Sequence, residues 1–477
     1  MRNVLLVIGL IFALAAGRSA EAAVYDLERI INRALEAGWS MRDARDDTRR
    51  AALRLQIAES EFELKIYPGA SVGFSGGDDL DTETDLTLGI RLSKRTAYGT
   101  QIDLSPTVQR IDDQYQSQAD LRIVQPLLRG AGRDYTLSSV YSARYGERVS
   151  WRSRLLTEIN TVLTAVRYGY EVVRQREVLR LRQESYQRLL DLTEATAIKE
   201  GMGLATAMDL YRVRIQLNQA EEELNQSREN YQGALDNLKV FLALPLEETV
   251  DVTLPLNFDR AHPQVDAMIQ TALTSRVELE QVRDELSEAR RLADNARSDT
   301  LPDLDIGISL NMAGDPSSDF PGSTPDQTTW GVSLASSSDF RRVAEKAVYE
   351  NSLITVQQVS RRQLILKDEI TAEVKREIRN LERQDKAIAT QEDQVHQARG
   401  QLALARIKFE HGLTDNFDLM DAENALRRAE TQLVSAVIEY ILGQFQLRKA
   451  IGTLIQRSDS GANVPAVVKP TSKMNDR

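Results

Sequence analysis

Few residues of this chain have the types and spacing that chemistry requires. Its three histidines, His262, His396 and His411, are far apart in the sequence, and none belongs to a metal-ligand spacing. There is no cysteine, which excludes disulfides, thiolate nucleophiles and lipid attachment to an N-terminal cysteine. No nucleophile, general base or metal cluster is visible, so an enzyme is the least favoured class of function and we expect no cofactor.

Two carboxylates have a spacing that matters. Asp418 and Asp421 are three residues apart, which places them on one face of a helix. An acid near a helix start is also favoured by the positive end of the helix dipole, and this structural interpretation applies to Asp418 and to Asp209. For Asp209 the structural and the functional interpretation both stay open.

These acids follow two copies of one hairpin. Segments 198–224 and 407–433 are identical at 10 of 27 positions, including Gly203/Gly412, Leu204/Leu413 and Asp209/Asp418. A second correspondence relates Tyr67-Pro68 to Leu301-Pro302, each followed by alternating apolar residues. The chain therefore consists of two tandem copies of one unit, which we place at 23–255 and 256–456.

The two ends of the chain differ from these repeats. Arg2, an apolar run from Val4 to Ala16 and the small-x-small sequence at 20–22 are typical of a secretory signal peptide over residues 1–22. We expect cleavage between Ala22 and Ala23, so the mature protein leaves the cytoplasm. Residues 457–477 are polar and unpatterned, and we predict a disordered tail. The net charge of −11, with acids and bases interspersed, argues against nucleic-acid binding.

Helical patterns occupy most of each repeat. The first runs from Leu27 to Ile66 and ends at Tyr67-Pro68. A second continues for about 70 residues to Glu200 and would be about 100 Å long; Gly201 and Gly203 break it, and a return helix runs to about Ala243. The second copy repeats the order with helices to about 296, to His411 and to about 455. One apolar seam marks the longest helix of the first copy: Leu155, Ile159, Val162, Val166, Tyr170 and Val173.

Strand patterns lie between these helices. Four runs are predicted in the first copy, at 70–76, 84–93, 100–110 and 119–125, and two in the second, at 303–312 and 329–335. Apolar and polar residues alternate along them, which gives each strand one apolar face. A long helix with a narrow apolar seam needs partner helices along its length. A sheet in lipid needs hydrogen bonds for all of its backbone groups, and several chains that share one closed barrel provide them. The pattern predicts a membrane β-barrel continued by a helical tube.

The chain resembles the TolC-type outer-membrane efflux proteins over nearly all of its mature length. The resemblance rests on the duplicated helix–strand–strand–helix–helix order, on Leu301-Pro302, on the Gln125-Pro126-Leu127-Leu128 return, and on the Gly-Leu-x-x-x-x-Asp-Leu hairpins at 203–210 and 412–419. It implies a mainly α protein with membrane β-strands, in which three chains form one outer-membrane β-barrel and a periplasmic α-helical barrel. It also implies a passive exit duct for efflux or type I secretion, docked to an inner-membrane transporter through a periplasmic adaptor.

The resemblance assigns roles to particular residues. Gly203-Leu204 and Gly412-Leu413 would be periplasmic tips where the adaptor docks. Asp418 and Asp421 would point into the closed aperture, with Asp209 as a further candidate, and a threefold copy would give rings of carboxylates that select cations. Some members of the family carry a basic residue two places after the second tip glycine, whereas this chain has Thr414 there.

Two alternatives stay open at this stage. The first copy has four candidate strands where the usual repeat has two, so either each chain gives six strands to the barrel or residues 94–117 form a hairpin outside it. The rival function is a periplasmic coiled-coil scaffold without channel activity, which explains the helices but not the apolar-faced strands. The exported substrate, whether a drug, a metal or a polypeptide, does not follow from the sequence.

Overall fold

The computed structural model describes residues 23–77, 80–111, 114–260, 264–316, 325–456 and 464–465. The expected signal peptide at 1–22, including Ala22, lies outside the described residues, as does the 457–477 tail apart from its short strand β10 (Val464–Pro465), which pairs with β9 (Ile455–Gln456). Ala23 begins strand β1 (Ala23–Tyr25). The described chain divides into two compact units, and their boundary falls inside long helices.

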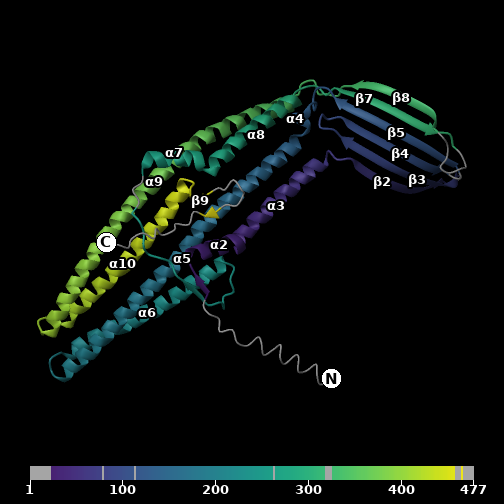
Figure 1. Cartoon of the computed structure of the whole chain (residues 1–477). Coiled ribbons are helices and arrows are strands. Elements are labelled where there is room, and N and C mark those ends of the chain that lie inside the picture. The colour runs from purple at the N-terminus through teal and green to yellow at the C-terminus, as the bar shows by residue number, and fades with distance from the viewer. Residues whose placement is uncertain are drawn as a thin grey trace, which may run out of the picture. The chain divides into compact units, whose positions relative to one another are not determined.

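Nine helices are present in the described residues, and the longest repeat the same order in both halves (Figure 1). The hairpin α5–α6 corresponds to α9–α10: α5 has 64 residues and α9 has 68, while α6 and α10 have 35 each. The helices are α2 (Leu27–Ala37), α3 (Trp39–Ser60), α4 (Arg133–Thr136), α5 (Ser138–Gly201), α6 (Ala207–Phe241), α7 (Val265–Ser275), α8 (Val277–Asp299), α9 (Val343–Glu410) and α10 (Asn416–Ala450). No helix in the described part of the chain is both long and apolar enough to cross a membrane.

The unit formed by residues 46–152 and 278–366 contains one antiparallel sheet of six strands. Its order is β2-β3-β4-β5-β7-β8, so the four strands of the first copy lie beside the two of the second (Figure 1). The strands are β2 (Lys65–Gly77), β3 (Leu80–Arg95), β4 (Gln101–Ile111), β5 (Gln114–Pro126), β7 (Asp305–Gly314) and β8 (Pro325–Ala335). Because β4 pairs with β3 on one side and with β5 on the other, the described strand residues between 94 and 117 belong to the sheet and are not a hairpin outside it.

The other unit contains the remaining helical segments and the main hydrophobic core. Strand β1 pairs in parallel with β6 (Val250–Val252), and both pack into this core. The predicted seam of α5 is confirmed, because Val162, Val166 and Val173 are at most 1% exposed. Helices α2, α5, α6 and α10 contribute most of the other buried residues of this core.

The first predicted helix is wrong in its bounds. It is interrupted at Gly38, which caps α2, and it ends at Ser60 rather than Ile66. Tyr67 and Pro68 lie within β2, which is an edge strand, and a proline is tolerated there because not every backbone N–H of an edge strand is needed for pairing.

Candidate functional site

One face of the six-stranded sheet is apolar across all of its strands. Residues directly opposite each other in an antiparallel pair point to the same face. Leu92 lies opposite Leu104, Leu104 opposite Leu121, Leu121 opposite Leu310, and Leu310 opposite Trp330. The apolar face therefore continues without interruption from the first copy of the repeat into the second.

This apolar face is open to its surroundings. Phe74 on β2 is 75% exposed and Trp330 on β8 is 77% exposed. Other exposed members of the same face are Ile66, Val72, Leu88, Ile90, Ile308, Val332 and Leu334. Each strand has at least 10 residues, and about 9 to 11 tilted residues cross a bilayer. A contiguous apolar surface of this extent fits a membrane.

The opposite face of the sheet is polar. Gln109 Nε2 donates to Asp85 Oδ1 at 3.0 Å, and Asn311 Nδ2 donates to Asp120 on the neighbouring strand. Asp103 on β4 lies opposite Arg122 on β5. A sheet with one apolar and one polar face meets the requirement for a barrel that has lipid outside and water inside.

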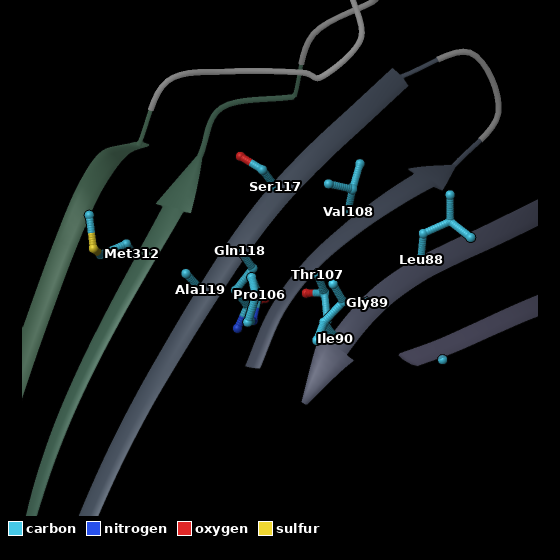
Figure 2. Close-up of a pocket in the computed structure, with 11 residues that line it drawn as sticks. Leu88, Gly89, Ile90, Pro106, Thr107, Val108, Ser117, Gln118, Ala119 and Met312 are labelled. Atoms are coloured by element: carbon cyan, nitrogen blue, oxygen red, sulfur yellow. The ribbon is translucent and has the colours of Figure 1, made fainter. Parts of the chain in front are cut away.

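A shallow groove of about 570 Å³ crosses the apolar face (Figure 2). It lies where small side chains meet: Pro106 is opposite Ala119, while the larger Leu88 and Met312 border it on β3 and β7. Since the groove is part of the apolar face, the apolar character of that face accounts for it.

The passage from sheet to helix is held by polar contacts. After β5, Leu127 N donates to Leu304 O at 2.8 Å, and the Arg129 guanidinium contacts the carboxylates of Asp299 and Asp303. The first copy has Pro126 where the strand leads back to a helix, and the second copy has no proline at the corresponding position. There, after β8, Ser336 Oγ donates to Asp303 O at 2.7 Å.

The two predicted hairpin tips have the same backbone structure. Gly203 and Gly412 have φ values of 74° and 69°, a left-handed conformation that disfavours other residues. In each tip the leucine N–H bonds to the carbonyl five residues earlier, that of Lys199 or Lys408, at 2.8 Å. This pattern is a Schellman motif, in which the residue after the glycine commonly packs back onto the helix.

The tip leucines do not pack back in this way. The position they would cover is occupied by a lysine in both hairpins, and Leu204 is 74% and Leu413 76% exposed. Met202 beside the first tip is also exposed. Two equivalent apolar tips are therefore available to a partner.

The two hairpins are joined to each other close to these tips. Lys199 Nζ of α5 lies 3.8 Å from the centroid of the Phe409 ring of α9 and donates to Phe409 O at 3.0 Å. Asn416 Nδ2, in the first turn of α10, donates to Thr196 Oγ1 at 3.2 Å, and both side chains are buried. No sequence pattern singled out Thr196 or Asn416, because a buried polar pair between distant segments leaves no local periodicity.

The three candidate aperture acids differ in their surroundings. Asp209 forms a capping box with Thr206, and these hydrogen bonds hold the pKa of its carboxyl below the ordinary value. Asp418 accepts a hydrogen bond from the Thr414 hydroxyl. Asp421 is exposed and makes no hydrogen bond or ion pair with the described residues. Asp209 thus caps α6, Asp418 has one side-chain hydrogen bond, and Asp421 has none with the described residues.

An ion pair that the sequence did not predict lies further along the hairpins. Arg188 Nε of α5 donates to Glu423 Oε2 of α10 at 2.8 Å. Glu423 is 8% exposed, and burial raises the pKa of its carboxyl although Arg188 acts in the opposite direction. Glu423 follows Asp421 by two residues, so it points to another side of α10, toward the packed interior.

The remaining candidates for chemistry are dispersed. His396 and His411 are exposed on α9 and just after it, and His262 lies outside the described residues. Within the described ranges, no group of three or more acids and histidines could hold a metal ion. Gly130 and Gly132 have positive φ values at the passage between β5 and α4.

Known outer-membrane channels share this fold. The Campylobacter jejuni CmeC outer membrane channel matches with a TM-score of 0.70 and 14% identity over 90% of this chain and 85% of its own. VceC, an outer membrane protein of Vibrio cholerae, matches with a TM-score of 0.69 and 14% identity over 89% and 96%. The open state of the Neisseria gonorrhoeae MtrE outer membrane channel matches with a TM-score of 0.68 and 18% identity over 89% and 88%.

Sequence comparison agrees with this class of fold. The profile of the outer membrane efflux protein family matches residues 268–453, which cover most of the second repeat. The search of curated proteins gave no match. The fold of this chain, with its two-faced sheet, is that of known outer-membrane channels.

Proposed function

We propose that this chain is the exit duct of a tripartite efflux or type I secretion system. In this function three copies form one barrel in the outer membrane and one helical barrel in the periplasm. The observation that carries the proposal is the six-stranded sheet, whose apolar face is exposed along β2 and β8 and partly exposed between them, while its other face is polar. A periplasmic scaffold has no use for such a face, so the scaffold alternative is disfavoured.

The hairpin tips serve in this proposal as the docking surface. Leu204 and Leu413 are exposed at two equivalent turns, and an adaptor that presents apolar side chains would cover both. The adaptor in turn would connect the duct to an inner-membrane transporter. In this proposal the duct opens when the adaptor docks, and no cofactor takes part.

Asp421 and Asp418 are the proposed aperture residues. Two exposed carboxylates in each of three chains would form two rings, which attract cations and repel each other. Asp209 is a weaker candidate, because its carboxylate caps α6.

The proposed processing divides the chain as the sequence suggests: a signal peptide at 1–22, repeats at 23–255 and 256–456, and a tail at 457–477. The decisive experiment is fractionation followed by planar-bilayer recording of the purified protein. We expect an outer-membrane trimer that begins at Ala23 and conducts ions. A monomer that is soluble without detergent would contradict the proposal and support the scaffold.

A further inference from the structure

The two edges of the six-stranded sheet are unpaired. Among the residues that the structure describes, β2 pairs only with β3, and β8 pairs only with β7. They have 13 and 11 residues, so each leaves a long row of backbone groups without strand partners. Open edges of this length associate with other strands unless they are protected. Six strands are also fewer than the eight of the smallest membrane barrels, so one chain cannot close by itself.

The edges are matched in direction and in face. All five neighbouring pairs are antiparallel and the strand number is even, so β2 and β8 run in opposite directions. Placed side by side in two copies, they form another antiparallel pair. Val72 and Phe74 on β2 then continue the same apolar surface as Trp330 and Val332 on β8.

We propose that three copies join β2 to β8 in this way and close a barrel of eighteen strands, whose lumen is wide enough for hydrophilic cargo of polypeptide size. This proposal rests on the proposed function, from which the number of three copies is taken. The six strands of each chain come from the sheet itself. Barrel diameter grows with strand number, and 16 to 18 strands enclose an aqueous channel in porins.

Strands β3 and β4 supply the additional width. With strands about 4.8 Å apart and tilted by about 40°, eighteen strands give a backbone diameter of about 36 Å, whereas twelve would give about 24 Å. Side chains take about 5 Å on each side, which leaves a lumen of about 26 Å. Both β3 and β4 keep the two faces of the sheet, since Leu88 lies opposite Val108 and Thr87 opposite Gln109.

The lumen surface suits a hydrated cargo. The polar face contains amide and hydroxyl side chains on β4 and β5, with Asp103 and Arg122 opposite each other. Such a wall offers hydrogen bonds in both directions and no apolar patch to retain a passing chain. Size selection would then occur at the helical aperture and not in the barrel.

The absence of cysteine allows a direct test by disulfide formation between copies. Ser71→Cys on β2 is combined in turn with a cysteine in place of Gln327, Thr329 or Ser333 on β8, all on the polar face. We expect one combination to give a covalently closed trimer upon oxidation. A covalent dimer as the largest product would indicate twelve strands from two copies and overturn the proposal. No disulfide between copies in any combination would overturn the pairing of the edges.

A second measurement tests the width. Polymers of graded size are added on the barrel side of the channel in a planar bilayer, and the parent is compared with a variant lacking residues 80–111, which joins β2 to β5. We expect the parent to admit polymers of roughly twice the radius. Equal size limits would overturn the eighteen-stranded barrel, and if the shortened variant does not assemble, the disulfide result decides. A trimer that conducts ions in either case would leave the proposed function intact.

Discussion

Arg188 and Glu423 join the two repeats of this chain through an ion pair of 2.8 Å between α5 and α10. Glu423 is buried while Arg188 is about one-third exposed, so the pair gives a buried acid a hydrogen-bonded cation. The same two helices are joined nearer the tips by the buried contact between Thr196 and Asn416. The equivalent hairpins are thus fixed to each other by polar contacts over an otherwise apolar interface.

This pair predicts a pH-dependent stability. Burial raises the pKa of the Glu423 carboxyl in the folded protein above its value in the unfolded protein. Protonation of Glu423 therefore stabilises the fold. This stabilisation is fully present below the unfolded-state pKa of Glu423 and is lost as the pH rises through its folded-state pKa. Arg188→Met removes the opposing charge and raises that pKa further. We expect it to cost about 2 kcal/mol at pH 8 and clearly less at pH 5.

Thermal unfolding of the detergent-solubilised protein at both pH values measures this effect. Adding Glu423→Gln to Arg188→Met serves as the matched control, because it removes the ionisable group and should abolish the pH difference. An equal loss of stability for Arg188→Met at pH 5 and pH 8 would show that the charge of Glu423 is not involved.

The tip leucines predict a docking defect without a folding defect. Changing Leu204 and Leu413 to Asp should abolish export and leave the amount of trimer unchanged, because side chains about three-quarters exposed contribute little to packing. Changing both to Met keeps the tips apolar and should retain export. Crosslinking to the adaptor provides the direct measurement, and crosslinking as strong in the Asp variant as in the parent would argue against docking at the tips.

The aperture acids predict ion selectivity. Asp418→Asn with Asp421→Asn should weaken cation preference and block by multivalent cations in planar-bilayer recordings, since it removes two rings of charge. The fold should persist because both residues are exposed. Asp209→Asn is the control in the first hairpin and should affect selectivity less, because that carboxylate caps α6. Unchanged selectivity in the double variant would identify these acids as helix-start residues that face solvent.

Strand β4 predicts alternating accessibility. A cysteine in place of Leu104, which lies opposite Leu92 and Leu121, should react with a lipid-soluble maleimide but resist a charged one. A cysteine in place of the neighbouring Ser105 lies on the polar face and should react with both in the open lumen. Similar reactivity of the two positions with the charged reagent would place β4 away from lipid.

Periodicity and duplication predicted much of this fold. The repeat of Gly203-Leu204 at Gly412-Leu413 located both tips, because a left-handed turn after a helix is encoded by a local sequence. Alternation of apolar and polar residues located all six strands. This signal is also local, because the two faces of a strand have different surroundings. The first helix was predicted too long, because a helical period continues past Gly38 and Ser60, whereas capping and strand pairing set the actual ends.

Contacts between distant segments required the tertiary structure. The position of β4 between β3 and β5 decided that each chain has a six-stranded sheet, a matter that the sequence left open because strand order depends on pairing partners and not on the strand itself. In the same way, Arg188 and Glu423 are 235 residues apart, and neither has a local pattern that reveals the other. The sequence by itself located the long helices, the six strands of the sheet and the two tips. Only packing decided which charges are buried and which acids, such as Asp421, remain exposed.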